Sequence, residues 1–257
     1  MQTAPWRERA ADTPEGASYV TPEPAPSGAK LWFFTRKGGV SEAPYDTLNV
    51  STLVGDEPSS VEVNRARIRT TMDGRSSAWV RQVAGDGVVR VGEGRFAGEG
   101  DALVTAGQGF ALAVAIADCV PVALVGEGVV GMVHSGWRGT LKGISGKAAR
   151  EMGDPSSIRA YIGPGIRGCC YEVSAEIAGQ FAKRFGREVV DGRMLSLAGA
   201  IQTDLREVGV KEVHDLGLCT GCRTNLFYSH RKEGPKTGRN LAAVALDPGS
   251  DSRRDER

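Results

Sequence analysis

The stretch "IADCVPVALVGEGVVGMVHSGWRG", residues 116–139, contains two apolar runs joined by a short glycine turn. Valine-rich runs of this length on either side of "GEG" predict a buried β-hairpin. Cys119 begins the first run and His134 ends the second, so antiparallel pairing brings the thiol and the imidazole to the same end of a sheet. The stretch therefore predicts both a central piece of the fold and a pair of reactive side chains.

A neighbouring thiol and imidazole suit two kinds of chemistry. An imidazole can activate a thiolate as a nucleophile, and the same sulfur and nitrogen atoms are suitable ligands for zinc or copper. The alternative without a function is a buried cysteine beside a hydrogen-bonded core histidine. Asp118, directly before the thiol, and "SGWRG" after the imidazole favour a functional site, because polar groups at the ends of buried strands are costly unless they are used.

Strands and helices are predicted in mixed order along the chain. The segments "KLWFFTRKGGV", "DALVTA" and "GFALAVAIAD" indicate strands, whereas "PSSVEVNRARIRTTM", "GTLKGISGKAAREMG", "SAEIAGQFAKRFG" and "LSLAGAIQTDLREVGV" indicate helices. Because the two types do not alternate strictly, we expect an α+β fold with mixed or largely antiparallel sheets. The composition of residues 1–29 and 248–257 predicts two disordered tails around one domain, residues 30–247.

The composition limits the expected partners and compartment. Thirty-two basic and 31 acidic residues leave a net charge of +1, so no global field attracts nucleic acid or an anionic membrane. The chain has no run of 18 apolar residues and no visible secretory signal, so neither a membrane-spanning helix nor secretion is expected. Five cysteines, an odd number, favour reduced thiols in the cytoplasm over a disulfide framework.

Two basic loops and a second group of cysteines are weaker signals. "FTRKGGVS" places Arg36 and Lys37 before two glycines whose N–H groups could approach an anion, but a basic surface turn fits equally well. "SHRKEGPKTGRN" is typical of a solvated loop. "CTGC" at 219–222 and the adjacent Cys169–Cys170 contain four thiols. A vicinal pair is a poor second zinc knuckle, so inert or weakly redox-active thiols are expected.

Taken together, these motifs resemble the bacterial YfiH/YlmD family, also called laccase-domain or multicopper polyphenol oxidoreductase-like proteins. The motifs that carry the resemblance are "FTRKGGVSEAPYDTLNVS", "VGDEP", "ADCVPVAL", "VHSGWRG", "YIGPGI…CCYEV", "CTGC" and "FYSHRKEG…TGR". The resemblance runs from about Leu31 to Leu246. It implies an α/β/β/α layered fold in which two mixed β-sheets pack between helices, similar to the catalytic domain of cytotoxic necrotizing factor toxins.

The resemblance also implies an activity. The family is associated with purine nucleoside phosphorolysis, in which adenosine, inosine, guanosine or methylthioadenosine gives the base and a pentose 1-phosphate. Adenosine deamination and peptidoglycan precursor editing are two further associations. The expected partners are therefore small molecules, a purine nucleoside and phosphate. By residue type and position, Arg36, Arg65 and Arg138 are candidates to hold phosphate, and Asp118 is a candidate to orient or exchange a proton.

A metal site is implied by the same resemblance. The family binds zinc or copper through a histidine in "QVHG", the cysteine of "ADC" and the histidine of "HxGWRG". Cys119 and His134 match two ligands, but the first segment here is "QVAGDG", with Ala84 at the histidine position. A catalytic zinc normally has three protein ligands, so we expect a weakened site. The candidates to replace the missing ligand are His230, His214, Asp86 and Asp118.

Three hypotheses follow. The first, which we prefer, is a purine nucleoside phosphorylase whose metal site is weakened by Ala84 unless another side chain replaces the missing ligand. The second is a metal-free hydrolase or deamidase in which His134 activates Cys119. The third is a catalytically impaired homologue that binds its ligand, with a role in peptidoglycan precursor editing.

Overall fold

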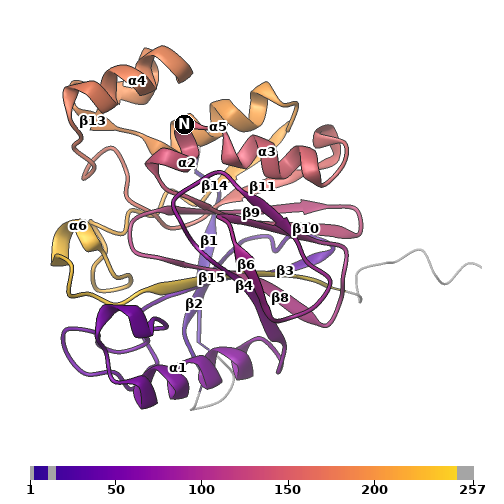
Figure 1. The fold of residues 1–257 in the computed structure, drawn as a ribbon, viewed down its shortest axis with the longest axis vertical. Helices are drawn as coiled ribbons and strands as arrows, with labels where there is room; N and C mark the ends of the chain where they lie inside the picture. Colours follow the sequence, from indigo (N-terminus) through magenta and orange to yellow (C-terminus); the bar gives the residue numbers. More distant parts are fainter. Residues whose placement is uncertain (1–2, 11–15, 248–257) are drawn as a thin grey trace, which may run out of the picture.

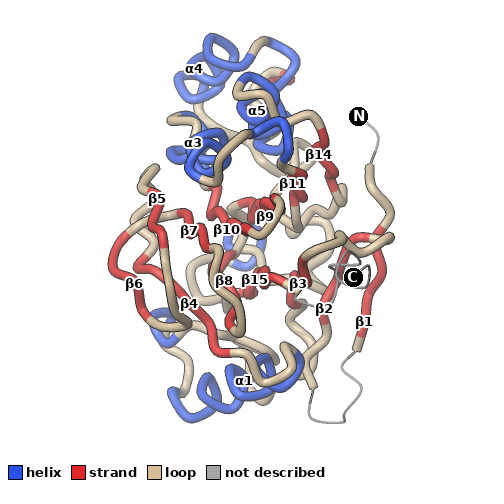
Figure 2. Tube along the Cα trace, turned by 90° about the vertical axis from the view of Figure 1, so that its right-hand side faces the viewer, coloured by secondary structure: helices blue, strands red, loops and turns tan. Residues whose placement is uncertain are grey.

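The structure, a computed structural model, describes residues 3–10 and 16–247. Two large β-sheets pack face to face, and helices cover the outer face of each sheet (Figure 1). The view turned by 90° shows the same sequence of layers, with the strands between two groups of helices (Figure 2). This arrangement confirms the predicted α+β fold with two mixed sheets between helices.

The first sheet has seven strands. They are β1 (Trp6–Arg9), β2 (Tyr19–Pro22), β3 (Ala29–Phe34), β4 (Ser76–Arg81), β6 (Phe96–Glu99), β8 (Phe110–Ile116) and β15 (Asn240–Leu246). Their spatial order is β1-β2-β3-β15-β8-β4-β6, in which β4 runs parallel to both neighbours and the other pairs are antiparallel. Helix α1 (Pro58–Thr71) packs on the outer face through Ile68.

The second sheet has six strands. They are β5 (Val88–Arg90), β7 (Ala102–Thr105), β9 (Val120–Gly126), β10 (Val129–Ser135), β11 (Arg159–Ile162) and β14 (Glu212–Asp215). Their spatial order is β14-β11-β9-β10-β7-β5, with parallel pairs at the two ends. The outer face is covered by α2 (Trp137–Leu141), α3 (Ile144–Glu151), α4 (Ala175–Phe185) and α5 (Leu197–Glu207).

Smaller elements complete the described chain. Strands β12 (Val190–Asp191) and β13 (Met194–Leu195) pair with each other, and the short helix α6 (His230–Glu233) precedes β15. Within the described ranges, no helix combines the length and apolar character that crossing a membrane requires.

The predicted hairpin is present and lies in the middle of the second sheet. β9 and β10 pair from Gly126 opposite Val129 to Ser135 opposite Val120. Gly128 has a φ of +66°, the left-handed conformation that a tight turn here requires and that glycine adopts without strain. Both strands are buried because one face meets the first sheet and the other meets the helices, which explains why their sequence is continuously apolar.

The prediction of a disordered tail over residues 1–29 is wrong for part of that segment. β1 and β2 form there and extend the first sheet beyond β3. Ala17 and Val20 are fully buried, and the backbone N–H of Ala17 donates to Oγ1 of Thr71. Two four-residue strands are too short to show a clear alternation within proline-rich sequence. The predicted tail at residues 248–257 lies outside the described residues.

One predicted helix is divided in two. The segment 139–153 was expected to form a single helix, but it contributes the end of α2 and then α3, with Gly143 between them. Gly143 has a φ of +74°, which breaks the regular helical backbone. Residue 143 also packs closely against α5, because a Cβ atom at Gly143 would lie 2.9 Å from Oδ1 of Asp204.

The substitution Val20→Ala tests whether the amino-terminal strands belong to the folded domain. Removing two buried methyl groups should lower the free energy of unfolding by about 2 kcal/mol. A denaturant titration of the full chain would measure the difference. Val63→Ala is the matched control, because Val63 is 43% exposed on α1 and its change should stay within about 0.5 kcal/mol. Equal effects in both variants would contradict the assignment.

Candidate active site

The hairpin brings Cys119 and His134 to the same end of the second sheet, as the sequence predicts. Cys119 directly precedes β9 and is half-buried, while His134 is buried near the end of β10. A Cβ atom added at Gly136 would lie 3.1 Å from Sγ of Cys119 and 3.9 Å from Cε1 of His134. Both side chains therefore border the same small space, which stays open because residue 136 has no side chain.

The imidazole of His134 has a buried carboxylate as a hydrogen-bond partner. Nδ1 of His134 lies 2.8 Å from Oδ1 of Asp101, whose side chain is fully buried. Burial alone would lower the pKa of His134, but the charge of Cys119 and hydrogen bonds with Asp101 and Cys119 raise it to about 10. The imidazole is therefore protonated at neutral pH. Thiol, imidazolium and carboxylate form one continuous group.

Asp101 also holds the loop in which the resemblance places the third metal ligand. The carboxylate accepts hydrogen bonds from the backbone N–H groups of Val83, Ala84 and Gly85, at 3.2, 3.1 and 2.7 Å. Burial opposes its ionisation, but the contacts with His134 and Gly85 hold the pKa of Asp101 below its usual value. Asp101 was not among the candidates chosen from the sequence. The one feature that pointed to it was the position of a charged residue directly before the buried strand "ALVT".

The geometry of Ala84 fits the position of a lost ligand. Its φ is +54°, a conformation in which histidine is found more often than most residues. Within residues 3–10 and 16–247, the one group of three or more side chains suited to a metal consists of four cysteines elsewhere. Cys119 and His134 thus supply two donors without a third, and the donor set does not fit the three-ligand metal site that the family implies.

The four candidate replacements have other surroundings. His214 on β14 stacks on Tyr161 with ring centroids 4.9 Å apart, and Asp86 forms ion pairs with two lysines, Lys142 and Lys147. His230 is exposed at the start of α6. None of them belongs, with Cys119 and His134, to a group of metal-binding side chains in the described part of the chain.

Asp118, the last candidate, ties two loops to the site. Its Oδ1 accepts from the hydroxyls of Thr220 and Ser229, both at 2.7 Å, and its Oδ2 accepts from the backbone N–H of Arg231 at 2.6 Å. Its φ of +86° turns the chain sharply just before Cys119. These contacts give the carboxylate a positioning role, and they provide no support for the proton exchange considered from the sequence.

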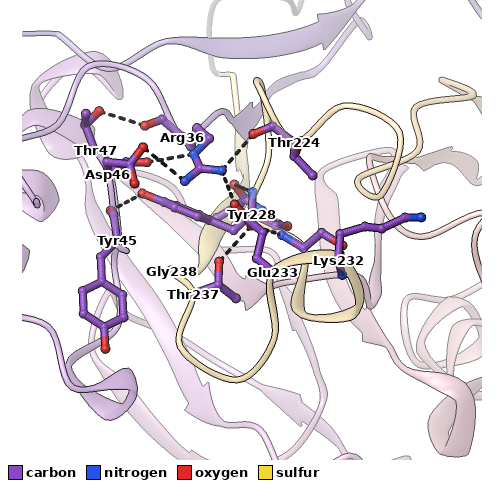
Figure 3. A network of polar contacts seen from close by, with 12 residues as sticks. Arg36, Tyr45, Asp46, Thr47, Thr224, Tyr228, Lys232, Glu233, Thr237 and Gly238 are labelled. Carbon is purple, nitrogen blue, oxygen red and sulfur yellow. Dashed lines mark hydrogen bonds and ion pairs between the residues drawn. The ribbon is translucent and has the colours of Figure 1, made fainter. Parts of the chain in front are cut away.

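Arg36 and Arg65 are held by the protein framework. Arg36 donates to the carbonyl oxygens of Asp46 and Thr224 and forms an ion pair with Glu233 at 2.6 Å, and its guanidinium lies 4.5 Å from the centre of the Tyr228 ring (Figure 3). Arg65 donates its Nε hydrogen to the carbonyl of Val50. A guanidinium with several donors already occupied, as in Arg36, is a poor binder of phosphate. The contact of Arg65 with Val50 uses Nε alone.

Arg138 has a different environment. It is exposed, and its guanidinium lies 4.4 Å from the centre of the Trp137 ring. Tyr171 lies in the same region: burial and the charge of Cys119 raise the pKa of this phenol to about 12, and the positive charges of Arg231 and Arg138 oppose the rise. Arg231 itself lies over the Tyr171 ring, 5.0 Å from its centre.

Arg239 lies in the electrostatic neighbourhood of the thiol. Burial lowers the pKa of Arg239 below its usual value, and the charges of Cys119 and Asp118 counteract this effect. The segment "SHRKEGPKTGRN" is exposed at residues 230–233, as expected of a solvated loop, but Thr237 and Asn240 are buried. Asp118 anchors the segment through the backbone N–H of Arg231, a contact between residues more than a hundred positions apart.

The substitution Asp101→Asn should lower the pKa of His134, because it removes the charge that stabilises the imidazolium at Nδ1. The chain contains three histidines, so their Cε1 proton resonances can be followed by NMR across a pH titration. Asp86→Asn, which removes a carboxylate paired with lysines, is the control and should leave the His134 titration unchanged. An unaltered pKa in Asp101→Asn would refute the assigned pairing.

The same substitution should change how stability depends on pH. A histidine whose pKa rises on folding stabilises the folded state fully below 6.5, and the stabilisation is lost as the pH increases toward about 10. Unfolding free energies measured between these values should therefore decline less steeply in Asp101→Asn than in the unmodified chain.

Known proteins with similar sequences cover most of this chain. A family model described as multi-copper polyphenol oxidoreductase laccase matches residues 30–247. A Deinococcus radiodurans protein named purine nucleoside phosphorylase is 40% identical over 227 residues, covering 83% of this chain and 88% of that protein. Purine nucleoside phosphorylase ORF3 of Streptomyces griseus is 35% identical over 241 residues, covering 87% and 97%.

Solved structures show the same fold. YlmD from Geobacillus stearothermophilus superposes with a TM-score of 0.82 at 31% identity, and Bacillus licheniformis YfiH gives 0.82 at 28% identity. Each comparison covers 93% of this chain and 99% of the other. These matches confirm the resemblance found from the motifs. On the strength of the family model and of these relatives, the chain belongs to the multi-copper polyphenol oxidoreductase laccase family, together with YlmD and YfiH.

Proposed function

We propose that this protein cleaves purine nucleosides with phosphate, releasing the free base and a pentose 1-phosphate. The carrying observation is a half-buried thiol–imidazolium–carboxylate group. The charge of Cys119 acts on Arg239 and on Tyr171, and the charges of Arg138 and Arg231 also act on Tyr171. The names of the relatives favour the same chemistry. The substrates are small molecules, and the reduced cysteines favour the cytoplasm as the place of action.

Phosphate binds among Arg138, Arg231 and Arg239 in this proposal. Arg231 and Arg239 each donate from Nη1 to backbone carbonyls, which fixes the orientation of both guanidinium groups. Within the described ranges, no ion pair joins Arg138 to a carboxylate. Planar guanidinium groups bind phosphate oxygens through paired hydrogen bonds. This assignment keeps Arg138 from the sequence analysis and replaces Arg36 and Arg65.

The leaving base needs a proton, and His134 supplies it. As a phosphate oxygen forms its bond to C1′ of the ribose, the C1′–N9 bond breaks and its electron pair goes to the purine. His134, protonated at neutral pH, donates a proton to the departing base as a general acid. Asp101 fixes the ring through Nδ1, so the proton that goes to the base is the one on Nε2. Cys119 is the other hydrogen-bond partner of the ring before the base takes this proton. After base release, the imidazole takes up a proton from solvent.

No step is assigned to zinc or copper, the metals that the resemblance implies. Cys119 and His134 would be the two protein ligands of such an ion, and the side chain of Ala84 offers no donor atom. Adenosine deamination is a second reaction that the family association predicts for the same site. It is measured together with phosphorolysis by separating adenine, inosine and hypoxanthine from adenosine.

The proposal predicts the behaviour of two variants in a phosphorolysis assay with inosine. Cys119→Ala should abolish turnover, because the imidazolium loses its partner. Arg138→Gln should raise KM for phosphate about 10-fold or more, since a hydrogen bond to a charged group contributes about 1.5–3 kcal/mol. Chromatography of the released base gives the rates. Arg69→Gln on α1 is the control, since Arg69 lies at the end of that helix and should not affect either parameter.

Failure of the unmodified chain to release base at high enzyme concentration would refute the phosphorylase assignment. Base release that does not depend on phosphate would also refute it, and would identify a nucleoside hydrolase.

The substitution Ala84→His should complete a metal site. The backbone of residue 84 already has a conformation suited to histidine. Loss of an outer-shell partner alone lowers metal affinity about 10–100-fold, so the gain of a third direct ligand should raise zinc affinity by at least that factor. Metal content by mass spectrometry, compared with the double variant Ala84→His/Cys119→Ser, isolates the ion at this site. Equal metal in the two variants would contradict the role assigned to residue 84.

A metal-free hydrolase or deamidase is a second candidate, favoured by the order Cys119–His134–Asp101. A thiolate beside an imidazolium, itself oriented by a carboxylate, is the arrangement of a cysteine nucleophile. In a deamidation, the thiolate would attack the amide carbon, His134 would protonate the departing ammonia, and water would hydrolyse the thioester. Amidase activity that iodoacetamide abolishes and that phosphate does not affect would favour this candidate over the phosphorylase.

A further inference from the structure

Four thiols that are far apart in the sequence meet at one end of the second sheet. Cys169 and Cys170 lie in the turn after β11, and Cys219 and Cys222 lie in the loop after β14. Because β11 and β14 are parallel neighbours, both loops begin at the same end of the two strands. All four sulfur atoms lie within 4.8 Å of one another. Inert or weakly redox-active thiols were expected because a vicinal pair is a poor second zinc knuckle, yet here the vicinal pair lies against the two cysteines of "CTGC".

The backbone fixes this convergence. Gly165 and Cys219 form a parallel bridge, in which Gly165 donates to Leu218 and Thr220 donates to Gly165, both at 3.2 Å. A Cβ atom at Gly221 would lie 3.1 Å from Cβ and 3.2 Å from Sγ of Cys170. The glycine of "CTGC" therefore permits the two pairs of cysteines to approach. The sulfur positions follow from hydrogen-bonded backbone on both sides.

The distances match the geometry of a four-coordinate ion. Sγ of Cys222 lies 3.4 Å from Sγ of both Cys169 and Cys170. A tetrahedral zinc ion with bonds of about 2.3 Å separates its sulfur ligands by about 3.8 Å. The observed range, from 3.4 Å to at most 4.8 Å, lies around that value. The four sulfurs therefore surround a space of the size that one zinc ion fills.

We propose that Cys169, Cys170, Cys219 and Cys222 bind one zinc ion as a structural site, separate from Cys119 and His134. The ion clamps the two chain segments that lead to Tyr171 and Arg231, whose ring and guanidinium lie 5.0 Å apart. It adds a second attachment to the one that Asp118 makes with Thr220, Ser229 and Arg231. The site does not depend on the proposed phosphorylase activity.

Metal content of the full chain, purified under reducing conditions, tests the proposal. Mass spectrometry should find near one zinc per chain in the unmodified protein and in Cys119→Ser. The double variant Cys169→Ser/Cys222→Ser should retain less than a tenth of that amount. Both replaced cysteines are exposed, and circular dichroism checks that the variant folds. Ser156→Ala/Ser157→Ala, in the surface turn before β11, is a matched double-substitution control and should keep its zinc.

X-ray absorption of the unmodified, zinc-loaded protein tests the ligand set without any variant. Four sulfur neighbours at about 2.3 Å are expected, whereas a mixed sulfur–nitrogen shell would place the ion at Cys119 and His134 and overturn the proposal. Protein that takes up no zinc when it is fully reduced would overturn it as well. So would intact-mass measurements showing that the four cysteines form two disulfides in protein that has never been oxidised.

Removal of the ion should also lower the melting temperature, because the ion adds a link between two loops that the backbone bridge of Gly165 and Cys219 already joins. Zinc removal with a chelator, followed by thermal unfolding of the unmodified protein and of the double variant, measures this effect. The unmodified protein should lose stability on zinc release and the double variant should not change further. Identical responses would overturn the structural role.

Discussion

The buried carboxylate of Asp101 is the contact on which the active site depends. It accepts one hydrogen bond from the imidazole of His134 and three from the backbone of residues 83–85, so it joins the hairpin to a loop that follows β4. A buried charge is stable only when it is fully bonded, and here every bond comes from a part of the site. Its charge also helps to raise the pKa of the imidazole, which favours the protonated form that the proposed mechanism uses.

Asp118 performs the corresponding task on the other side of the thiol. It lies directly before Cys119, at the start of the hairpin, and accepts hydrogen bonds from Thr220, Ser229 and Arg231. These bonds hold the basic loop before β15 close to Cys119. The two aspartates precede β7 and β9 respectively. Each places a carboxylate next to the end of a strand, and this carboxylate holds a loop from another part of the chain. The site is therefore built where strand ends meet, and the two sheets supply a rigid support.

The metal chemistry of this chain is divided between two places. At Cys119 and His134 the donor set is one ligand short, because residue 84 is alanine. At the end of β11 and β14, four thiols converge with the separation that zinc requires. In our proposal, an ion in the second place stabilises the loops around the first without taking part in its chemistry. The proposed phosphorolysis then uses the positive charges of the arginines and of His134 for phosphate and for the leaving base.

The sequence by itself determined the hairpin, the pairing of Cys119 with His134 and the α+β layers, because valine runs and a glycine turn act locally. The ordered motifs of the chain were specific enough to indicate its family. Only the tertiary structure decided that Asp101 orients the imidazole, that Asp118 holds loops, and that the four thiols meet. It also placed β1 and β2 in the sheet. The contact of Asp101 with His134 joins residues 33 positions apart, and that of Asp118 with Arg231 joins residues 113 positions apart. No local pattern encodes such a distance; packing of the two sheets brings the residues together.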